Sequence, residues 1–122
     1  MSLLVHGIPS CGTVKKARAW LDEHGVAYTF VDLRESPPSA SIVATWVKHF
    51  GDKALRNTSG GSYRALGPEK DGWNSAQWSR AFAADPMLIK RPVVTRDGSP
   101  LIVGWNLDDE EILARLSAPA AR

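Results

Sequence analysis

The sequence predicts an α/β protein in which a β-α-β segment and a later β-β-α segment contribute to one sheet. Residues 3–7 (LLVHG) form a short apolar run that ends at a turn-forming stretch, which is typical of a strand followed by a loop. Residues 13–24 then place apolar side chains at helical spacing. Residues 26–33 (VAYTFVDL) are rich in β-branched and aromatic residues, as strands are. A β-α-β order predicts two parallel strands joined by a right-handed crossover.

The C-terminal part predicts a hairpin followed by a helix. Two β-like runs, residues 92–95 and 100–104, flank the sequence Arg-Asp-Gly-Ser, and Asp-Gly is a strong signal for a tight turn. Residues 107–118 are amphipathic and carry acidic side chains in the first turn, where the helix dipole favours them. A β-α-β unit followed by a β-β-α unit predicts a mixed four-stranded sheet of the thioredoxin-like kind.

The middle of the chain predicts helices that lie outside this sheet. Ser39 is the expected N-cap of a helix whose apolar side includes Ile42. Residues 52–74 are poorly periodic and rich in Gly and Ser, and Ser75 is the expected N-cap of a further helix that ends by Pro86.

We therefore expect a single domain over residues 1–122. Its thioredoxin-like core would comprise about 1–35 and 87–117, and a helical insertion would span about 38–86. A chain of this length with 43% apolar residues can bury a core without disulfides.

Composition narrows the classes of function. The net charge is only +2 and the basic residues are scattered, so we expect no direct nucleic-acid binding. The single cysteine excludes an internal disulfide, and no segment has the pattern of a signal peptide or a membrane span, which favours a cytoplasmic protein with no membrane contact. No residues have metal-ligand spacing, so we expect neither a metal nor a bound cofactor. We also expect a monomer.

Cys11 is the first candidate for chemistry. It lies in a Pro-Ser-Cys-Gly turn just before the predicted helix, where unpaired N–H groups and the positive end of the dipole stabilise a thiolate. Gly12 leaves room for an incoming group, and Lys15 adds a positive charge one turn later. A small buried core thiol is the alternative, but the polar turn favours a nucleophile. His6 either tunes Cys11 or is bonded locally to backbone, and we favour the second.

The sequence Lys90-Arg91-Pro92 is the second candidate. A proline at the start of a strand cannot donate a hydrogen bond to the ladder. A cis Arg91–Pro92 bond would direct Arg91 toward Cys11, whereas a trans proline on an edge strand is the alternative, and the sequence leaves both open.

Four stretches carry a family resemblance: GIPSCGTVKKARAWLDEHGVAYTFVDLRESPPS, ALRNTSGGSYRAL, MLIKRPVV and PLIVGWNLDDE. In order and spacing they resemble the arsenate reductase (ArsC)/Spx family, and most of all its YffB-like, Spx/MgsR-related branch. The resemblance covers nearly the whole chain and implies a thioredoxin-like fold with a helical insertion. It implies that Cys11 is the catalytic cysteine, and that Arg56 and Arg91 are two anion-binding arginines.

Three positions depart from the family patterns. Arsenate reductases carry a histidine where this chain has Gly7, and a third arginine where it has Val103 or Gly104. A doubly charged tetrahedral oxyanion needs several forked donors, so these losses argue against arsenate. The Spx redox switch uses a C-x-x-C pair, and here Val14 takes the second place.

What remains is a monothiol site, and the resemblance to the YffB-like branch implies a glutathione-dependent monothiol reductase. Its Cys11 thiolate would attack a disulfide, and glutathione as co-substrate, with glutaredoxin as a possible partner, would resolve the product. The expected substrate-binding residues are Gly12, Lys15, Arg56, Lys90, Arg91 and Pro92; the two arginines would hold a glutathione carboxylate and the lysines would add positive potential. The alternatives are a glutaredoxin-coupled arsenate reductase and a non-enzymatic Spx-like regulator that binds RNA polymerase.

Overall fold

The computed structural model describes residues 3–117, which form two compact units. The first unit contains the described residues up to Asp32 and from Arg91 onward, and the second is Leu33–Lys90. None of the helices in the described part of the chain is long and apolar enough to cross a membrane.

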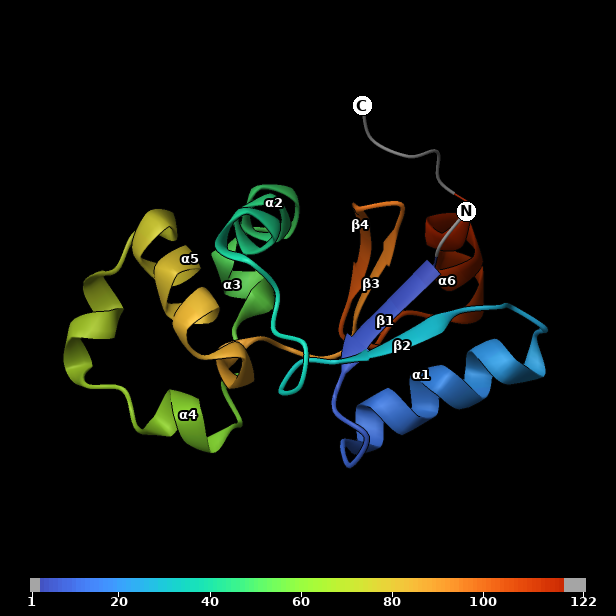
Figure 1. Cartoon of the computed structure of the whole chain (residues 1–122), viewed down its shortest axis with the longest axis horizontal. Helices are drawn as coiled ribbons and strands as arrows, with labels where there is room; N and C mark the ends of the chain where they lie inside the picture. The colour runs from blue at the N-terminus through green and yellow to red at the C-terminus, as the bar shows by residue number, and fades with distance from the viewer. Residues whose placement is uncertain (1–2, 118–122) are drawn as a thin grey trace. The chain divides into compact units, whose positions relative to one another are not determined.

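The first unit holds a mixed four-stranded sheet (Figure 1). Its strands are β1 (Leu3–Gly7), β2 (Thr29–Asp32), β3 (Val93–Arg96) and β4 (Ser99–Val103), in the order β2-β1-β3-β4. β1 pairs with β2 in parallel and with β3 antiparallel, and β3 pairs with β4 antiparallel. The predicted thioredoxin-like sheet is confirmed, with the second unit inserted between β2 and β3.

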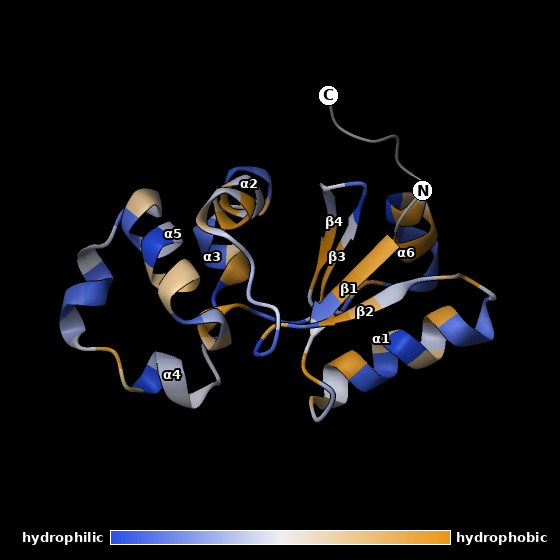
Figure 2. Cartoon of the chain, viewed as in Figure 1, coloured by the Kyte–Doolittle hydropathy of each residue, from blue (hydrophilic) through white to orange (hydrophobic). Residues whose placement is uncertain are grey.

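Two helices, α1 (Gly12–Glu23) and α6 (Asp109–Leu116), pack on one face of this sheet. Val5, at the centre of that face, is opposite Val94 on β3. The side chains that join the strands to the two helices in one core are Leu3, Val5, Val94, Leu101 and Ile102 from the strands, Leu21 from α1, and Ile112 and Leu116 from α6. The apolar colouring of β1 in Figure 2 agrees with its central place in this core.

The β3–β4 hairpin has the predicted turn at Asp97-Gly98. Both residues have positive φ angles, 49° and 85° respectively. A two-residue turn with φ > 0 at both central positions matches the twist of the flanking strands, and glycine adopts this conformation without strain.

The second unit is helical. Its elements are α2 (Ala40–Phe50), α3 (Asp52–Leu55), α4 (Gly61–Arg64), the 3-10 helix η1 (Pro68–Gly72), α5 (Ser75–Ala84) and the 3-10 helix η2 (Pro86–Leu88). Its largest fully buried side chains include Trp46 of α2 and Trp78 and Phe82 of α5. The predicted cap of α2 is confirmed, since the Ser39 hydroxyl accepts a hydrogen bond from the Ile42 N–H at 3.2 Å.

Three local predictions were wrong. The second strand is confined to residues 29–32, because Val26 and Tyr28 pack against the core from the loop after α1 and not from the sheet. Ile42 is 47% exposed because it lies off the buried face of α2. The N-cap of α5 is Asn74 and not Ser75.

Asn74 and Gln77 form a capping box at the start of α5. The Asn74 side chain accepts from the Gln77 N–H at 2.9 Å, and the Gln77 side chain accepts from the Asn74 N–H at 2.8 Å. These two bonds satisfy N–H groups that the helix itself leaves unpaired.

We predict that Asn74→Ala lowers the free energy of unfolding by about 1 kcal/mol, because the cap acceptor is lost. Urea unfolding followed by circular dichroism measures the change. Asn74→Asp keeps the acceptor and should stay close to wild type. Equal stability of Asn74→Ala and wild type would contradict the role of the capping box.

Candidate active site around Cys11

Cys11 occupies the N-cap of α1, at the end of the loop that leaves β1. Its backbone is extended, with φ −75° and ψ 125°, so the chain turns into the helix at this residue. The Cys11 N–H donates to the Ile8 carbonyl at 3.2 Å, and the Cys11 carbonyl accepts from the Lys15 N–H at 3.0 Å. The thiol is free and half-buried. It therefore lies at the surface end of the helix and outside the buried core.

The surroundings of Cys11 favour its thiolate. Burial by itself raises the pKa of the thiol. This effect is outweighed by the N–H groups of Val14 and Thr13 and by the hydrogen bond and charge of Arg91, so the pKa is lowered from its ordinary value. The Cys11 side chain makes no cap hydrogen bond of ordinary geometry. The thiolate is the form that the N–H groups and Arg91 stabilise.

Arg91 reaches Cys11 from the segment before β3. The Arg91–Pro92 bond is cis. β3 lies between β1 and β4, so the edge-strand alternative for Pro92 is wrong. Pro92 is buried and its carbonyl accepts from the Gly104 N–H at 2.8 Å, while Arg91 is half-buried. The structure therefore brings the two sequence candidates, Cys11 and Arg91, into contact.

Gly12 and Lys15 are exposed on the first turns of α1. A methyl group added at Gly12 would meet no atom within 4 Å. Position 12 therefore has open space for a side chain.

Arg56 and Lys90 belong to the second unit, where backbone contacts pair their segments. Arg56 and Ile89 form an isolated antiparallel bridge. The Lys90 N–H donates to the Leu55 carbonyl at 2.7 Å, and the Asn57 N–H to the Leu88 carbonyl at 2.8 Å. These bonds hold residues 86–90 in the second unit and bring the two predicted site residues of that unit to one place.

The Arg56 guanidinium already has two partners in the second unit. It forms an ion pair with Asp52, four residues earlier, and its Cζ lies 4.2 Å from the centre of the Trp78 ring. A hydrogen bond from Ser75, with a further contribution from Arg56, lowers the pKa of the Asp52 carboxyl despite its partial burial. Asp52 was not among the predicted site residues, although its spacing of four residues from Arg56 was a usable signal.

His6 is buried near the end of β1. Its Nε2 lies 3.3 Å from the Thr95 hydroxyl on β3, so a side chain of the neighbouring strand is one of its partners. Burial lowers the pKa of His6 to about 4, which keeps the ring neutral near pH 7. A neutral ring adds no positive charge to the Cys11 site.

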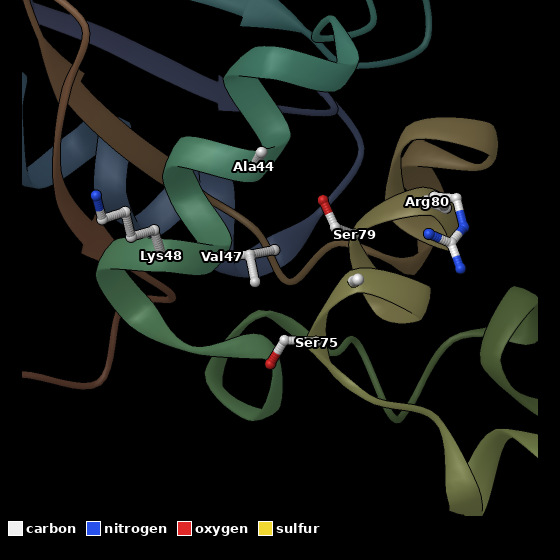
Figure 3. A pocket seen from close by; sticks show the side chains of 7 residues that line it. Ala44, Val47, Lys48, Ser75, Ser79 and Arg80 are labelled. Carbon is white, nitrogen blue, oxygen red and sulfur yellow. The ribbon is translucent and has the colours of Figure 1, made fainter.

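The second unit also has an open groove of about 470 Å³ between α2 and α5 (Figure 3). It is lined by Ala44, Val47, Lys48, Ser75, Ala76, Ser79 and Arg80. None of these residues was predicted to belong to the site. Within residues 3–117 there is also no group of three or more His, Cys, Asp or Glu side chains that could hold a metal ion.

The sequence and the fold of this chain are similar to those of known proteins. The sequence profile of the ArsC family matches residues 6–114. The Bacillus subtilis protein with the name "Uncharacterized protein YusI" is 38% identical over 115 residues, which cover 91% of this chain and 97% of YusI. The "Global transcriptional regulator Spx" of Listeria innocua is 28% identical over 103 residues, which cover 83% of this chain and 78% of that protein.

Two solved structures have the same fold. A possible arsenate reductase from Streptococcus mutans UA159 has a TM-score of 0.81 and 33% identity, and the match covers 90% of this chain and 96% of that one. The YFFB protein has a TM-score of 0.83 and 32% identity, with 95% and 100% covered. The chain belongs to the ArsC family, and it is arsenate reductase-like and Spx-like in sequence and in its thioredoxin-like fold.

We predict that Arg91→Met raises the pKa of the Cys11 thiol and slows its alkylation at pH 7 by about three-fold or more, because a charge and a hydrogen bond to the thiolate are lost. Arg91→Lys keeps the charge but loses the forked donor, so its effect should be smaller. Iodoacetamide labelling against pH measures both variants.

Arg80→Met removes an exposed arginine of α5 and is the matched control for Arg91→Met. It should label like wild type. The role of Arg91 would be contradicted by an Arg91→Met protein that folds and labels with the wild-type pH profile.

We also predict that the folded protein loses stability in acid because of His6. Between pH 6.5 and about 4 the unfolded chain binds a proton at this residue that the folded chain excludes. The free energy of unfolding therefore falls as the pH falls through this window, by about 3 kcal/mol from this group. Urea unfolding of wild type and His6→Gln at several pH values measures it, and parallel pH dependences would refute it.

Proposed function

We propose that this chain is a glutathione-dependent thiol–disulfide reductase in which Cys11 is the single nucleophile. The observation that supports the proposal most is the environment of the thiol. Cys11 is half-buried at a helix N-terminus, and the Thr13 and Val14 N–H groups and the Arg91 guanidinium favour its ionised form. The open space at Gly12 supports access by a second sulfur compound.

In the first half-reaction, the Cys11 thiolate attacks one sulfur of a disulfide. A bond forms between Cys11 Sγ and that sulfur, and the substrate S–S bond breaks. The other sulfur leaves as a thiolate and takes a proton from water. The charge that develops along the three sulfur atoms is stabilised by the α1 N–H groups and Arg91.

In the second half-reaction, glutathione regenerates the enzyme. The chain has no second cysteine, so the mixed disulfide needs an external thiol. One glutathione thiolate displaces the bound substrate thiol and leaves Cys11 joined to glutathione. A second glutathione then attacks the glutathione sulfur, which releases glutathione disulfide and the Cys11 thiolate. In total, one substrate disulfide is reduced and two glutathione molecules are oxidised.

The remaining residues have proposed roles in binding. Arg91 would hold a glutathione carboxylate, and Lys15 would raise the local positive potential. The family resemblance gives Arg56 the role of holding a carboxylate, and Lys90, like Lys15, would add positive potential. For Arg56 the proposal has to accommodate its ion pair with Asp52, which already uses part of the guanidinium.

We predict that glutathione disulfide converts the wild-type chain to a single adduct at Cys11, which mass spectrometry detects and which added glutathione or glutaredoxin reverses. Cys11→Ser should form no adduct. It should also abolish reduction of 2-hydroxyethyl disulfide in an assay coupled to glutathione reductase. A wild-type protein with no adduct and no turnover would contradict the proposal.

Arsenate reduction is the second candidate, supported by the structural likeness to a possible arsenate reductase. Turnover of arsenate that requires Cys11, glutathione and glutaredoxin would favour it over the first proposal. The residues Gly7, Val103 and Gly104 argue against it, because side chains that could bind the oxyanion are missing there.

A regulatory role is the third candidate, supported by the similarity to Spx of Listeria innocua. It requires a stable complex with RNA polymerase that Cys11→Ser leaves intact. Co-purification of the wild-type and Cys11→Ser chains with the polymerase separates this role from catalysis.

A further inference from the structure

Gly7 and Val14 make an unusually close contact between the end of β1 and the first turn of α1. A Cβ atom added at Gly7 would lie 2.6 Å from Val14 Cγ2 and 3.1 Å from Cγ1. Ordinary contacts of this kind are 3.4–4 Å. Any side chain at position 7 would therefore require Val14 to move by about 1 Å.

Neither Gly7 nor Val14 can easily move away to make room for a side chain at position 7. The Val14 side chain is fully buried, and a β-branched side chain on a helix has one strongly preferred rotamer. Gly7 is opposite Asp32 in the β1–β2 register, and the preceding residue, His6, is opposite Val93 on β3, so the strand end is held by its neighbours. Further along α1, Leu21 is fixed in the core. A displacement would therefore be concentrated in the first turn of α1.

That turn carries the two N–H groups that act on Cys11, those of Thr13 and Val14. We propose that Gly7 is a positioning residue for the Cys11 thiol. Because Gly7 has no side chain, Val14 can pack against β1. This packing holds the N–H groups of the first turn of α1 close to the Cys11 sulfur. The inference rests on the proposed function only in taking the Cys11 thiolate as the reactive species.

The same contact explains one departure from the arsenate reductase pattern. A histidine at position 7 is incompatible with Val14 in its present place, because the first carbon of its side chain would already overlap Val14. The chain thus has a glycine close to Val14 at the position where the resemblance leads one to expect an imidazole. The pair Gly7 and Val14 therefore favours a site that depends on backbone N–H groups.

The test is the pH profile of Cys11 alkylation by iodoacetamide in the full-length chain. Gly7→Ala should slow alkylation at pH 7 by about three-fold or more through a higher thiol pKa, with an unchanged limiting rate at alkaline pH. Gly7→Ala/Val14→Ala removes the overlapping methyl groups and should return the profile close to wild type. Gly72→Ala, at an exposed position with no atom within 4 Å of the added methyl, is the matched control and should match wild type.

Each outcome decides the inference. A folded Gly7→Ala with the wild-type profile overturns it, and so does a slowed Gly7→Ala that the double variant fails to restore. If Gly7→Ala does not fold, Val14→Ile enlarges the side chain on the helix side of the same contact. A slowed Val14→Ile then supports the inference, and an unchanged profile overturns it.

Failure of the proposed function gives a different result. If the wild-type chain shows an ordinary thiol pKa and no reductase turnover, the proposed function fails. If the wild-type thiol is reactive but Gly7→Ala is not slowed, or the double variant is not restored, the proposed function stands and the role of Gly7 is wrong.

Discussion

The site depends on one structural constraint, which is the place where α1 begins. Cys11 is both the last residue of the loop and the N-cap of the helix, so the first N–H groups of α1 act on its sulfur. Val14, in the first turn of α1, lies close to Gly7 at the end of the central strand β1. In our proposal this packing holds the first turn in place, and with it the N–H groups that act on the thiol.

Arg91 supplies the charge that the backbone cannot. Helix N–H groups are partial charges, and burial of the thiol works against them. A guanidinium beside the sulfur adds a full positive charge and a directed hydrogen bond. Both groups belong to the unit that holds the sheet. His6, on the same strand as Gly7, stays neutral near pH 7 and lies within hydrogen-bonding distance of the Thr95 hydroxyl, so it adds no positive charge to the site.

The sheet, the helical insertion, the hairpin turn and the place of Cys11 before a helix could be predicted from the sequence, because each has a strong local signal. The approach of Arg91 to Cys11 was one of two alternatives that the sequence left open. Asp-Gly marks the turn, and a cysteine in a polar turn before a helix marks the thiol. The N-cap of α5 was misplaced by one residue because Asn74 and Ser75 are both good caps, and only the Gln77 partner distinguishes them. The close approach of Val14 to Gly7 depends on tertiary distances that no local pattern reports, whereas the four-residue spacing of Asp52 and Arg56 was a local signal for their ion pair.

The most direct test of this account is a titration of the thiolate absorbance of the wild-type chain, with Cys11→Ser subtracted to remove the tyrosine signal. The account predicts a single transition with a midpoint below about 8.5, the value of an ordinary free cysteine. A midpoint at or above that value would show that α1 and Arg91 do not stabilise the thiolate. The chain would then be a thioredoxin-like binding protein whose single cysteine has no catalytic role.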